Sequence, residues 1–281
     1  MNELRSYTEY CEIVKQAKKV RKSTTTNCLM SEEEITRLSD QHRVYFEECD
    51  GGILIYVDEI SHFLLFYYWN PDFFMTIEPK NKAIVSRTVY SEQKKDSQKK
   101  IDQMLLQNNF KKGDVLRLAI KTGSTEGNKK IALAKRVFDG SGLKIVNAAE
   151  EYIQEIRELM DIDDAMHRYE IPYLTDQEIV ESGQKGRFVC VVDGNNKVVG
   201  FRGSSTENTS NGYMRIRDEY KVHFGIAMVL LDYSDTYSDE HGLKNISWIE
   251  EQNISSVRLH LDMGREWGNR YMEYMILDER L

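Results

Sequence analysis

The 281-residue sequence has only four cysteines and three prolines. Cysteine is the residue that builds disulfide scaffolds and many metal-based ones. Cys11, Cys28, Cys49 and Cys190 are scattered, and none belongs to a CxxC pair or to a metal-ligand spacing. Isolated thiols of this kind are typical of a reducing compartment. We therefore expect a cytoplasmic protein without a bound metal.

The sequence also lacks a long apolar run and an excess of positive charge. No run approaches the roughly 20 apolar residues that cross a bilayer, so no membrane segment is expected. The N-terminal stretch is charged and helical in pattern, which differs from a secretory signal. The net charge is −8. Because nucleic-acid binding needs a positive face, no nucleic-acid partner is expected.

The composition that is present fits a globular protein with two domains. Hydrophobic residues make up 41% of the chain and charged residues 30%, which is the balance of a soluble folded protein. The length is comfortable for two domains. The clearest break is Asp139-Gly140-Ser141-Gly142. We therefore predict one domain over residues 1–139 and a second over residues 143–281.

The first domain is predicted to begin with helices and to continue with strands. Ser31, followed by Glu34, is a capping-box signal for the second helix. Between Trp69 and Lys82 there is room for a loop but not for a phosphate-facing loop plus a helix. Helices are predicted over residues 3–22, 32–40 and 93–109, and strands over residues 44–48, 52–57, 62–69, 82–90, 114–120 and 130–138.

The second domain follows a similar order of elements. Thr175, followed by Glu178, is again a capping-box signal, and Gly194-Asn195-Asn196 is a hairpin turn. Helices are predicted over residues 148–161, 175–182 and 254–263, and a further helix is predicted to begin at Gly225. Strands are predicted over residues 143–146, 187–193, 197–204, 211–217 and 245–250, and a final strand is predicted to end at residue 277. Both halves therefore predict an α+β (mixed α/β) fold, with mostly antiparallel twisted sheets flanked by helices.

The stretch from Ile216 to Leu277 is the most informative one for function. Its loop Val222–Ala227 opens a helix. The start of a helix attracts phosphate groups through its N–H groups and its dipole. A strand, a short helix preceded by Asn253, and a final strand follow, and this order indicates how a coenzyme could be held.

From residue 143 onward the sequence resembles the GNAT family, the GCN5-related N-acetyltransferases. The coenzyme loop of that family typically reads Arg/Gln-x-x-Gly-x-Gly/Ala at a helix start, and this sequence matches it at Gly225 and Ala227. The residues at the spacing of the family's later Asn, small residue, Tyr and Gly are Asn253, Ser256, His260 and Gly264. The first half resembles a degenerate copy, which implies a tandem GNAT protein with one silent half.

The resemblance implies acetyl-CoA, or another acyl-CoA, as co-substrate. Its pantetheine arm would lie between the strands at 213–217 and 245–250, with its pyrophosphate at the helix start. The residues implied to contact the coenzyme are Ile216, Arg217, Val222, His223, Phe224, Gly225, Ile226, Ala227 and Asn253. Val222 departs from the family's Arg or Gln, and Lys221 is an alternative source of positive charge. Asn253 is also expected to cap the following helix.

His260 occupies the position of the family's Tyr, the acid that protonates the departing thiolate. A histidine with its usual pKa near ~6.5 is only partly protonated at neutral pH. The acid role therefore requires a carboxylate, such as Asp262 or Glu266, to raise the pKa of His260. The alternative is a half-buried helix histidine. The family's usual Glu base is absent from strand 212–217, and the remaining candidates for a base are Glu207, Glu250 and Glu251.

The function implied by the resemblance is transfer of an acyl group, with acetyl as the expected one, to a primary amine of a small molecule or peptide. Tyr213 and Tyr271 are candidates for lining the acceptor channel, and packing within the sheets is the alternative. A catalytically silent tandem GNAT-like binding or assembly module is the second hypothesis, favoured by the altered loop. An aminoacyl-tRNA-dependent transferase is the third, although the acidic composition argues against it. A homodimer formed through an exposed strand edge is a further hypothesis.

Overall fold

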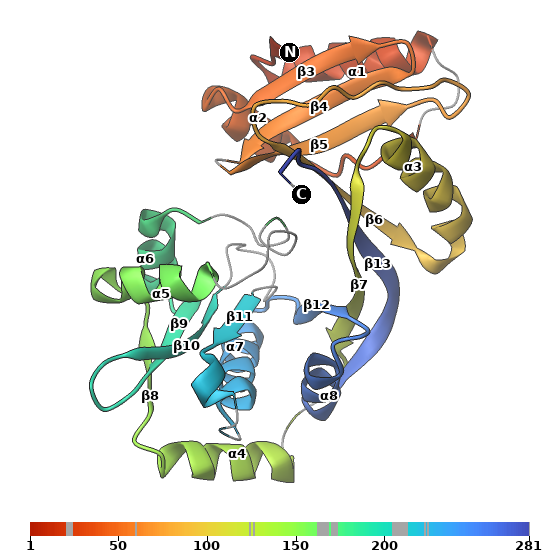
Figure 1. Cartoon of the computed structure of the whole chain (residues 1–281). Coiled ribbons are helices and arrows are strands. Elements are labelled where there is room, and N and C mark those ends of the chain that lie inside the picture. Colours follow the sequence, from red (N-terminus) through yellow and green to blue (C-terminus); the bar gives the residue numbers. More distant parts are fainter. Residues whose placement is uncertain are drawn as a thin grey trace. The chain divides into compact units, whose positions relative to one another are not determined.

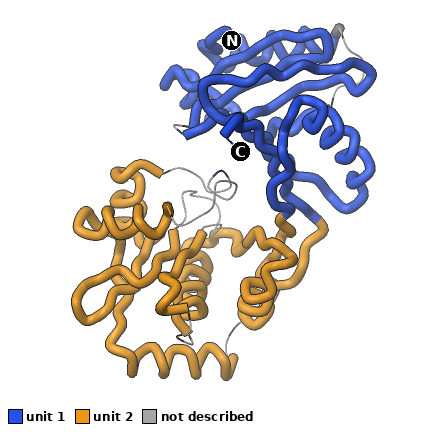
Figure 2. Tube along the Cα trace, in the orientation of Figure 1, with its two compact units in different colours: residues 1–115, 165–173, 270–281 blue, residues 116–164, 174–269 orange. Residues whose placement is uncertain are grey.

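The chain forms two compact units in the computed structural model. The residues that the structure describes are 1–20, 25–59, 61–123, 125, 127–161, 169, 174–203, 213–221, 223 and 225–280. Unit 1 comprises Met1–Val115, Ala165–Tyr173 and Arg270–Leu281, and unit 2 comprises Leu116–Asp164 and Leu174–Asn269 (Figure 2). Within the described part of the chain, no helix is both long and apolar enough to cross a membrane.

The described residues of unit 1 form sheet strands and the helices α1, α2 and α3 (Figure 1). Its elements are β1 (Asn2–Glu3), α1 (Tyr7–Val20), β2 (Thr25–Thr26), α2 (Glu32–Asp40), β3 (Val44–Cys49), β4 (Gly52–Glu59), β5 (His62–Trp69), β6 (Ala83–Ser91), the 3₁₀ turn η1 (Glu92–Lys94) and α3 (Lys95–Gln107). The strands β7 (Lys111–Lys121) and β13 (Arg265–Leu277) each run from one unit into the other.

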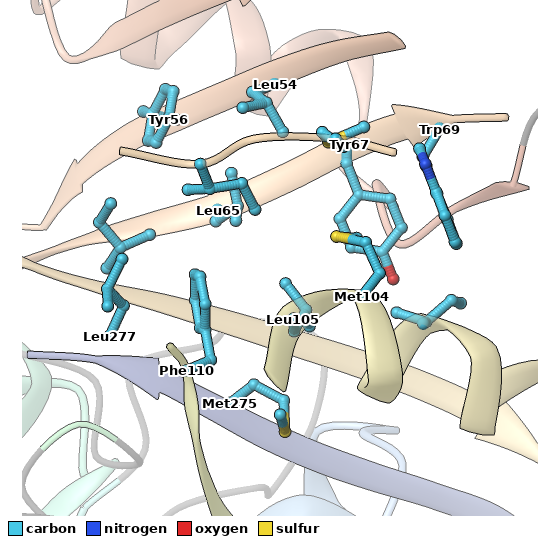
Figure 3. Close-up of a cluster of buried hydrophobic side chains, with 14 of the residues drawn as sticks. Leu54, Tyr56, Leu65, Tyr67, Trp69, Met104, Leu105, Phe110, Met275 and Leu277 are labelled. Atoms are coloured by element: carbon cyan, nitrogen blue, oxygen red, sulfur yellow. The ribbon is translucent and has the colours of Figure 1, made fainter. Parts of the chain in front are cut away.

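The core of unit 1 follows from the nearly continuous apolar sequences of β4 and β5. Strands of this kind are buried on both faces, and α1 packs on β4 and β5. On the other face, Leu54 and Tyr67 of these strands share a hydrophobic cluster with Met104 and Leu105 of α3 (Figure 3). As predicted, no helix lies between Trp69 and β6.

Unit 2 has a four-stranded sheet in the order β11-β10-β9-β8. Its elements are α4 (Lys129–Asp139), β8 (Lys144–Asn147), η2 (Glu150–Tyr152), α5 (Ile153–Met160), α6 (Asp176–Gln184), β9 (Phe188–Val192), β10 (Val198–Gly203), β11 (Tyr213–Ile216), η4 (Asp218–Tyr220), α7 (Ile226–Glu240), β12 (Ile246–Glu250) and α8 (Ile254–Asp262).

Both faces of this four-stranded sheet are covered by helices. Val189 and Val191 of β9 pack in a cluster with α4 and α7, whereas Phe188 and Cys190 pack in a cluster with α5 and α6. Alternate residues of a strand point to opposite faces, so the apolar strand β9 packs against helices on both faces of the sheet. The predicted mixed α/β class, with antiparallel-rich sheets flanked by helices, is confirmed.

The nine-stranded sheet explains why the compact units differ from the predicted domains. Its order is β1-β3-β4-β5-β6-β13-β7-β12, and β2 also pairs with β5. The last strand of the chain thus follows β6, in register Leu277↔Ile84, and β7 is next to β12, in register Ile120↔Ile246. Residues 116–139 therefore belong to unit 2 and residues 270–281 to unit 1, instead of dividing at residues 139–143.

One predicted element has the wrong type. Residues 130–138 were expected to be a strand but form helix α4, which begins after the N-cap Asn128. The Asn128 side chain accepts hydrogen bonds from the N–H groups of Lys130 and Ile131. The buried residues Ile131, Ala134 and Phe138 lie three and four positions apart, which places them on one face of a helix. By contrast, the capping box predicted at Thr175 is present in α6.

Candidate coenzyme site

The two sheets end at β11 and β12, the strands that precede and follow α7. β11 pairs with β10, and β12 pairs with β7. In the described part of the chain, no ladder joins β11 to β12, so each is the last strand of its sheet. We call the gap between β11 and β12 the sheet break. Met214 of β11 and Leu259 of α8 pack against one hydrophobic cluster, so both sides of the sheet break belong to the same core. A strand edge without a neighbouring strand offers backbone groups to another extended chain.

The start of α7 depends on a glycine. Gly225 has φ = 112° and ψ = −24°, and its carbonyl accepts the first helical hydrogen bond, from the N–H of Val229, at 2.8 Å. The positive φ favours glycine. A Cβ atom at Gly225 would also lie 3.0 Å from the carbonyl oxygen of Ala134 in α4. The requirement for glycine is therefore set by the backbone conformation and by the close approach of α4.

The loop before Gly225 is described only in part. Val222 and Phe224 lie outside the described residues. His223 is exposed, and its ring stacks on Tyr220 with the centroids 5.5 Å apart. Lys221, the alternative source of positive charge, is exposed and pairs with Asp218 at 2.6 Å.

The remaining residues predicted at the helix start have packing roles in the structure. Ile216 and Ile226 belong to one hydrophobic cluster, so the structure brings the end of β11 to the start of α7. Ala227 is half-buried. The Arg217 guanidinium donates to the carbonyl of Val198 at 2.7 Å and pairs with Glu155 and Glu158 of α5 at 3.3 Å.

Asn253 caps α8, as expected. Its side-chain oxygen accepts a hydrogen bond from the N–H of Ser256 at 3.0 Å. The residue is exposed, and the helix that it caps, α8, contains His260. The capping role and a contact with a coenzyme amide are compatible, because the amide group has both donors and an acceptor.

His260 is a buried residue of α8 with 7% of its surface exposed. Its Nδ1 lies 2.8 Å from the carbonyl oxygen of Ser256. Because a carbonyl only accepts, Nδ1 carries the proton and Nε2 is an acceptor. Burial lowers the pKa of His260 to about 3, and the nearby Arg265 and Arg202 act in the same direction. The imidazole is thus neutral, and the condition for an acid role, a carboxylate that raises its pKa, is not met.

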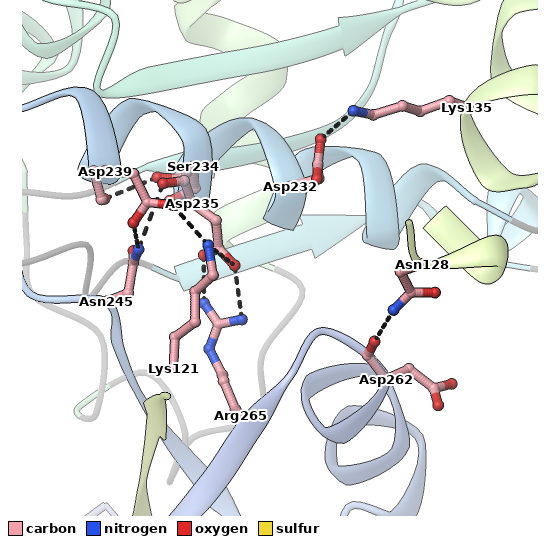
Figure 4. Close-up of polar contacts among 11 residues, drawn as sticks. Lys121, Asn128, Lys135, Asp232, Ser234, Asp235, Asp239, Asn245, Asp262 and Arg265 are labelled. Carbon is pink, nitrogen blue, oxygen red and sulfur yellow. Dashed lines mark hydrogen bonds and ion pairs between the residues drawn. The ribbon is translucent and has the colours of Figure 1, made fainter. Parts of the chain in front are cut away.

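A charge network around the buried pair of Asp235 and Arg265 was not predicted (Figure 4). The Arg265 guanidinium donates to both carboxylate oxygens of Asp235, at 3.0 and 2.5 Å. The Lys121 ammonium lies 2.8 Å from Asp239 and 3.9 Å from Asp235, and Asn245 donates to Asp239 at 2.7 Å. This network ties α7 to β7, β12 and β13. The sequence signal for it is a set of polar residues, Asp232, Asp235 and Ser238, on the buried side of α7.

The predicted acceptor tyrosines fall into different units. Tyr213 lies in unit 2, where its ring meets Phe201 edge-on at 5.3 Å. Tyr271 lies in unit 1, where it stacks on Tyr90 at 5.7 Å and the Lys95 ammonium lies 4.3 Å from its ring centre. Neither unit by itself brings the two tyrosines together.

The candidate bases have different surroundings. Glu207 lies outside the described residues, and Glu250 is half-buried in β12. Glu251 is exposed and pairs with Arg117 at 2.9 Å. The side chain of Glu251 is thus engaged in a surface ion pair, which leaves Glu250 as the candidate that lies on the sheet break itself.

In unit 1 the corresponding sheet break is filled by the chain itself. By element order β5 and β6 correspond to β11 and β12, and they pair in parallel only from His62↔Ala83 to Leu65↔Ser86. Beyond this point β2 pairs with β5. Asn27 then bridges the two strands: it donates to the carbonyl of Leu65 at 3.0 Å and to that of Arg87 at 3.3 Å. The gap between β5 and β6 is therefore filled by residues 25–27.

Comparison with known proteins identifies the fold. No protein-family pattern matches this sequence, and no curated protein is significantly similar to it. A GCN5-related N-acetyltransferase from Sphaerobacter thermophilus is similar in structure with a TM-score of 0.51 at 12% identity, over 95% of this chain and 91% of that one. A putative GNAT-family acetyltransferase from Novosphingobium aromaticivorans gives a TM-score of 0.50 at 13% identity, over 81% and 89%.

A Drosophila protein is also similar, with a TM-score of 0.54 at 9% identity, over 80% of this chain and 74% of that one. At such identities the likeness concerns the fold. The sheet break at β11 and β12 and the helix start at Gly225 are the parts of that fold that the sequence pattern had indicated. The chain has the fold of the GCN5-related N-acetyltransferases.

Proposed function

We propose that unit 2 is an acyltransferase that moves an acetyl group from acetyl-CoA to a primary amine of a small molecule or peptide. The observation that carries this proposal is the sheet break between β11 and β12 beside the start of α7. In unit 1 the equivalent break is filled by Asn27, so one coenzyme binds per chain. The four cysteines are free thiols, in keeping with a cytoplasmic location.

The coenzyme is held mainly by backbone groups in this proposal. The amides of its pantetheine arm pair with the facing edges of β11 and β12 in the manner of an added strand. Asn253, at the start of α8, hydrogen-bonds one of these amides. The phosphates lie toward the start of α7, where helix N–H groups and the dipole favour negative charge.

The chemical step is attack of the amine nitrogen on the thioester carbon. The carbonyl oxygen takes up negative charge, which backbone N–H groups near Ile216 stabilise. The carbon–sulfur bond then breaks, the thiolate takes a proton from water, and the amine nitrogen loses one to water. With its neutral imidazole, His260 positions a hydrogen-bond donor of the substrates through Nε2 rather than supplying the proton.

A combined binding and transfer experiment tests this function. Acetyl-CoA is titrated by calorimetry, and acetylated products from a panel of primary amines are then sought by mass spectrometry. We expect binding at one site per chain and a mass gain on at least one amine. Binding without any acetylated product would favour the second candidate below.

The second candidate is a catalytically silent GNAT-like binding module. Two observations favour it: the Ala134 carbonyl in contact with Gly225 and the low pKa of His260, about 3. The first restricts the phosphate end of the site, and the second removes the proton donor expected from the family pattern. His260→Tyr separates the two candidates, because restoring a phenol is expected to raise the transfer rate only in an enzyme.

A further inference from the structure

Helix α4 covers the start of α7. Ile131, Ala134 and Phe138 pack in the same hydrophobic cluster as Ile226. A Cβ atom at Gly225 would lie 3.0 Å from the carbonyl oxygen of Ala134 and 3.2 Å from its Cα atom. The backbones of the two elements are therefore in van der Waals contact. The side of Gly225 on which a Cβ atom would lie therefore has no room for a phosphate, and the nearest atom there is the carbonyl oxygen of Ala134.

Polar contacts hold α4 to the helices on both sides of the sheet break (Figure 4). At one end, Asn128 donates to the carbonyl oxygen of Asp262 in α8 at 2.7 Å, and Lys130 pairs with the Asp262 carboxylate at 2.6 Å. Further along, Lys135 pairs with Asp232 of α7 at 2.7 Å. The Lys130 and Lys135 side chains are 62% and 52% exposed. Ion pairs to lysines this exposed contribute little stability, so the packing of Ile131, Ala134 and Phe138 supplies most of the attachment and the ion pairs adjust it.

The surroundings of α4 leave it room to move. Gly127 precedes it and Gly142 follows it, both with φ = 76°, and a Cβ atom at either would have no atom within 4 Å. Glycines at the ends of an element can absorb large backbone changes. A hollow of about 340 Å³ lies beside the helix, lined by Lys135 and by Val229 and Tyr233 of α7 among others. The hollow therefore borders α4 at Lys135.

We propose that α4 is an autoinhibitory strap, which must leave the start of α7 before the phosphates of an acyl-CoA can bind there. This inference rests on the proposed function. The pantetheine part of the donor lies along β11 and β12 and does not meet the Ala134–Gly225 contact. A phosphate-free thioester therefore binds with the strap in place. Acetyl-CoA binds only the molecules with a displaced strap, and its apparent affinity falls in proportion to their fraction.

The test compares acetyl-CoA with S-acetylpantetheine, which lacks the nucleotide and its phosphates. Both are titrated by calorimetry into the parent chain and into Lys135→Glu, which turns the pair with Asp232 into a repulsion. Lys130→Glu does the same toward Asp262 at the other attachment. The control is Lys129→Glu, which makes the same charge change on α4 at an exposed residue with no ion pair among those found in the described ranges.

We expect Lys135→Glu and Lys130→Glu each to bind acetyl-CoA about fivefold more tightly than the parent, which corresponds to the loss of one weak ion pair. The affinity for S-acetylpantetheine stays the same in all four proteins, and Lys129→Glu matches the parent. Thermal unfolding confirms that each variant is folded. Hydrogen exchange over residues 129–139 of the parent increases when acetyl-CoA is added.

Three results would overturn the strap, and they differ in what they say of the proposed function. If S-acetylpantetheine binds but acetyl-CoA binds the Lys135 and Lys130 variants no more tightly than the parent, the strap is wrong and the donor site stands. Weaker binding to both variants would mean that these lysines hold the phosphates. If neither donor binds the parent or any variant, the site and the strap both fail.

Discussion

At the residue scale, Asp235 decides how α7 is fixed in unit 2. It forms two hydrogen bonds with Arg265, and both side chains are almost completely buried, at 2% and 0% exposure. Taking two charges out of water is costly, and removing one partner leaves the other charge buried and uncompensated. The pair is therefore more important for the geometry of α7, β13 and α8 than a surface ion pair would be.

Asp235→Ala is accordingly expected to lower the free energy of unfolding by about 3–5 kcal/mol. The matched control is Asp239→Ala, one helical turn along α7, where the side chain is 59% exposed and the expected loss is below about 1 kcal/mol. Urea unfolding followed by circular dichroism measures both. Equal losses for the two variants would show that the buried pair has no special role.

His260 gives the protein a stability that depends on pH. Its pKa in the folded protein is lowered to about 3, chiefly by burial, whereas the unfolded value is near ~6.5. Between these values the unfolded chain binds more protons than the folded one. The contribution of His260 is thus complete above about pH 6.5 and is lost as the pH falls.

His260→Gln should therefore flatten the fall of stability in acid, by up to about 1 kcal/mol per pH unit between about pH 6 and 4. His62→Gln should act in the same sense, because burial and the nearby Arg87 lower the pKa of His62 to about 4. Exposed His42 provides the control. Urea unfolding at several pH values measures the slopes, and an unchanged slope in both buried variants would contradict the account.

At the element scale, the sheet break of unit 1 is closed by residues that look like a polar loop in the sequence. Thr25 and Thr26 pair with Trp69 and Tyr68. Asn27 is 4% exposed, and its side-chain oxygen accepts from the N–H of Tyr67 at 2.9 Å. The segment thus satisfies backbone groups of β5 that a bound chain would otherwise satisfy.

Asn27→Ala is expected to destabilise unit 1 by about 2–4 kcal/mol, because it leaves several buried backbone groups without partners. The variant should still bind one acetyl-CoA per chain. Asn195→Ala, in the exposed turn between β9 and β10, provides the control, with a loss below about 1 kcal/mol. A second coenzyme site in Asn27→Ala would show that Asn27 alone closes the sheet break of unit 1.

Elements with strong local signals could be predicted from the sequence, and those defined by distant partners could not. The Ser31 and Thr175 caps are local, because each side chain bonds an N–H three residues ahead. Helix α4 differs from the predicted strand because its buried residues Ile131, Ala134 and Phe138 recur at helical spacing. The role of Asn27 depends on strands some forty and sixty residues away along the chain, and no local pattern shows it.

The candidate site follows the same division. The positions of Gly225 and Asn253 at helix starts could be predicted, since caps and glycine-rich turns have local signatures. The neutral state of His260 could not, because it follows from burial and from Arg265 and Arg202, which other elements bring close to it. The division of the candidate acceptor tyrosines, Tyr213 in unit 2 and Tyr271 in unit 1, could not be predicted either, because it follows from the continuation of β13 into unit 1.

At the scale of the whole molecule, the two halves of the sequence are not two independent folding units. β13 pairs with β6 along residues 270–277, so the last strand of the second half completes the sheet of the first. β7 of the first half pairs in turn with β12 of the second. Each half thus lacks a central strand when the other is absent.

The fragments 1–139 and 143–281 are therefore expected not to fold cooperatively when each is expressed alone. Mixing them should restore a cooperative unfolding transition, because the long-range strand pairs can form again. Circular dichroism and size-exclusion chromatography measure both states. Two fragments that each unfold cooperatively on their own would contradict the exchange of β7 and β13 and would support the boundary predicted at residues 139–143.

The most direct measurement of the central claim is hydrogen exchange of the whole chain with and without S-acetylpantetheine. The account predicts slower exchange at β11 and β12, where the pantetheine amides would pair with the strand edges, and no change at β5 and β6, where Asn27 already occupies the break. Slower exchange at β5 and β6, or unchanged exchange throughout unit 2 at saturating ligand, would contradict the account.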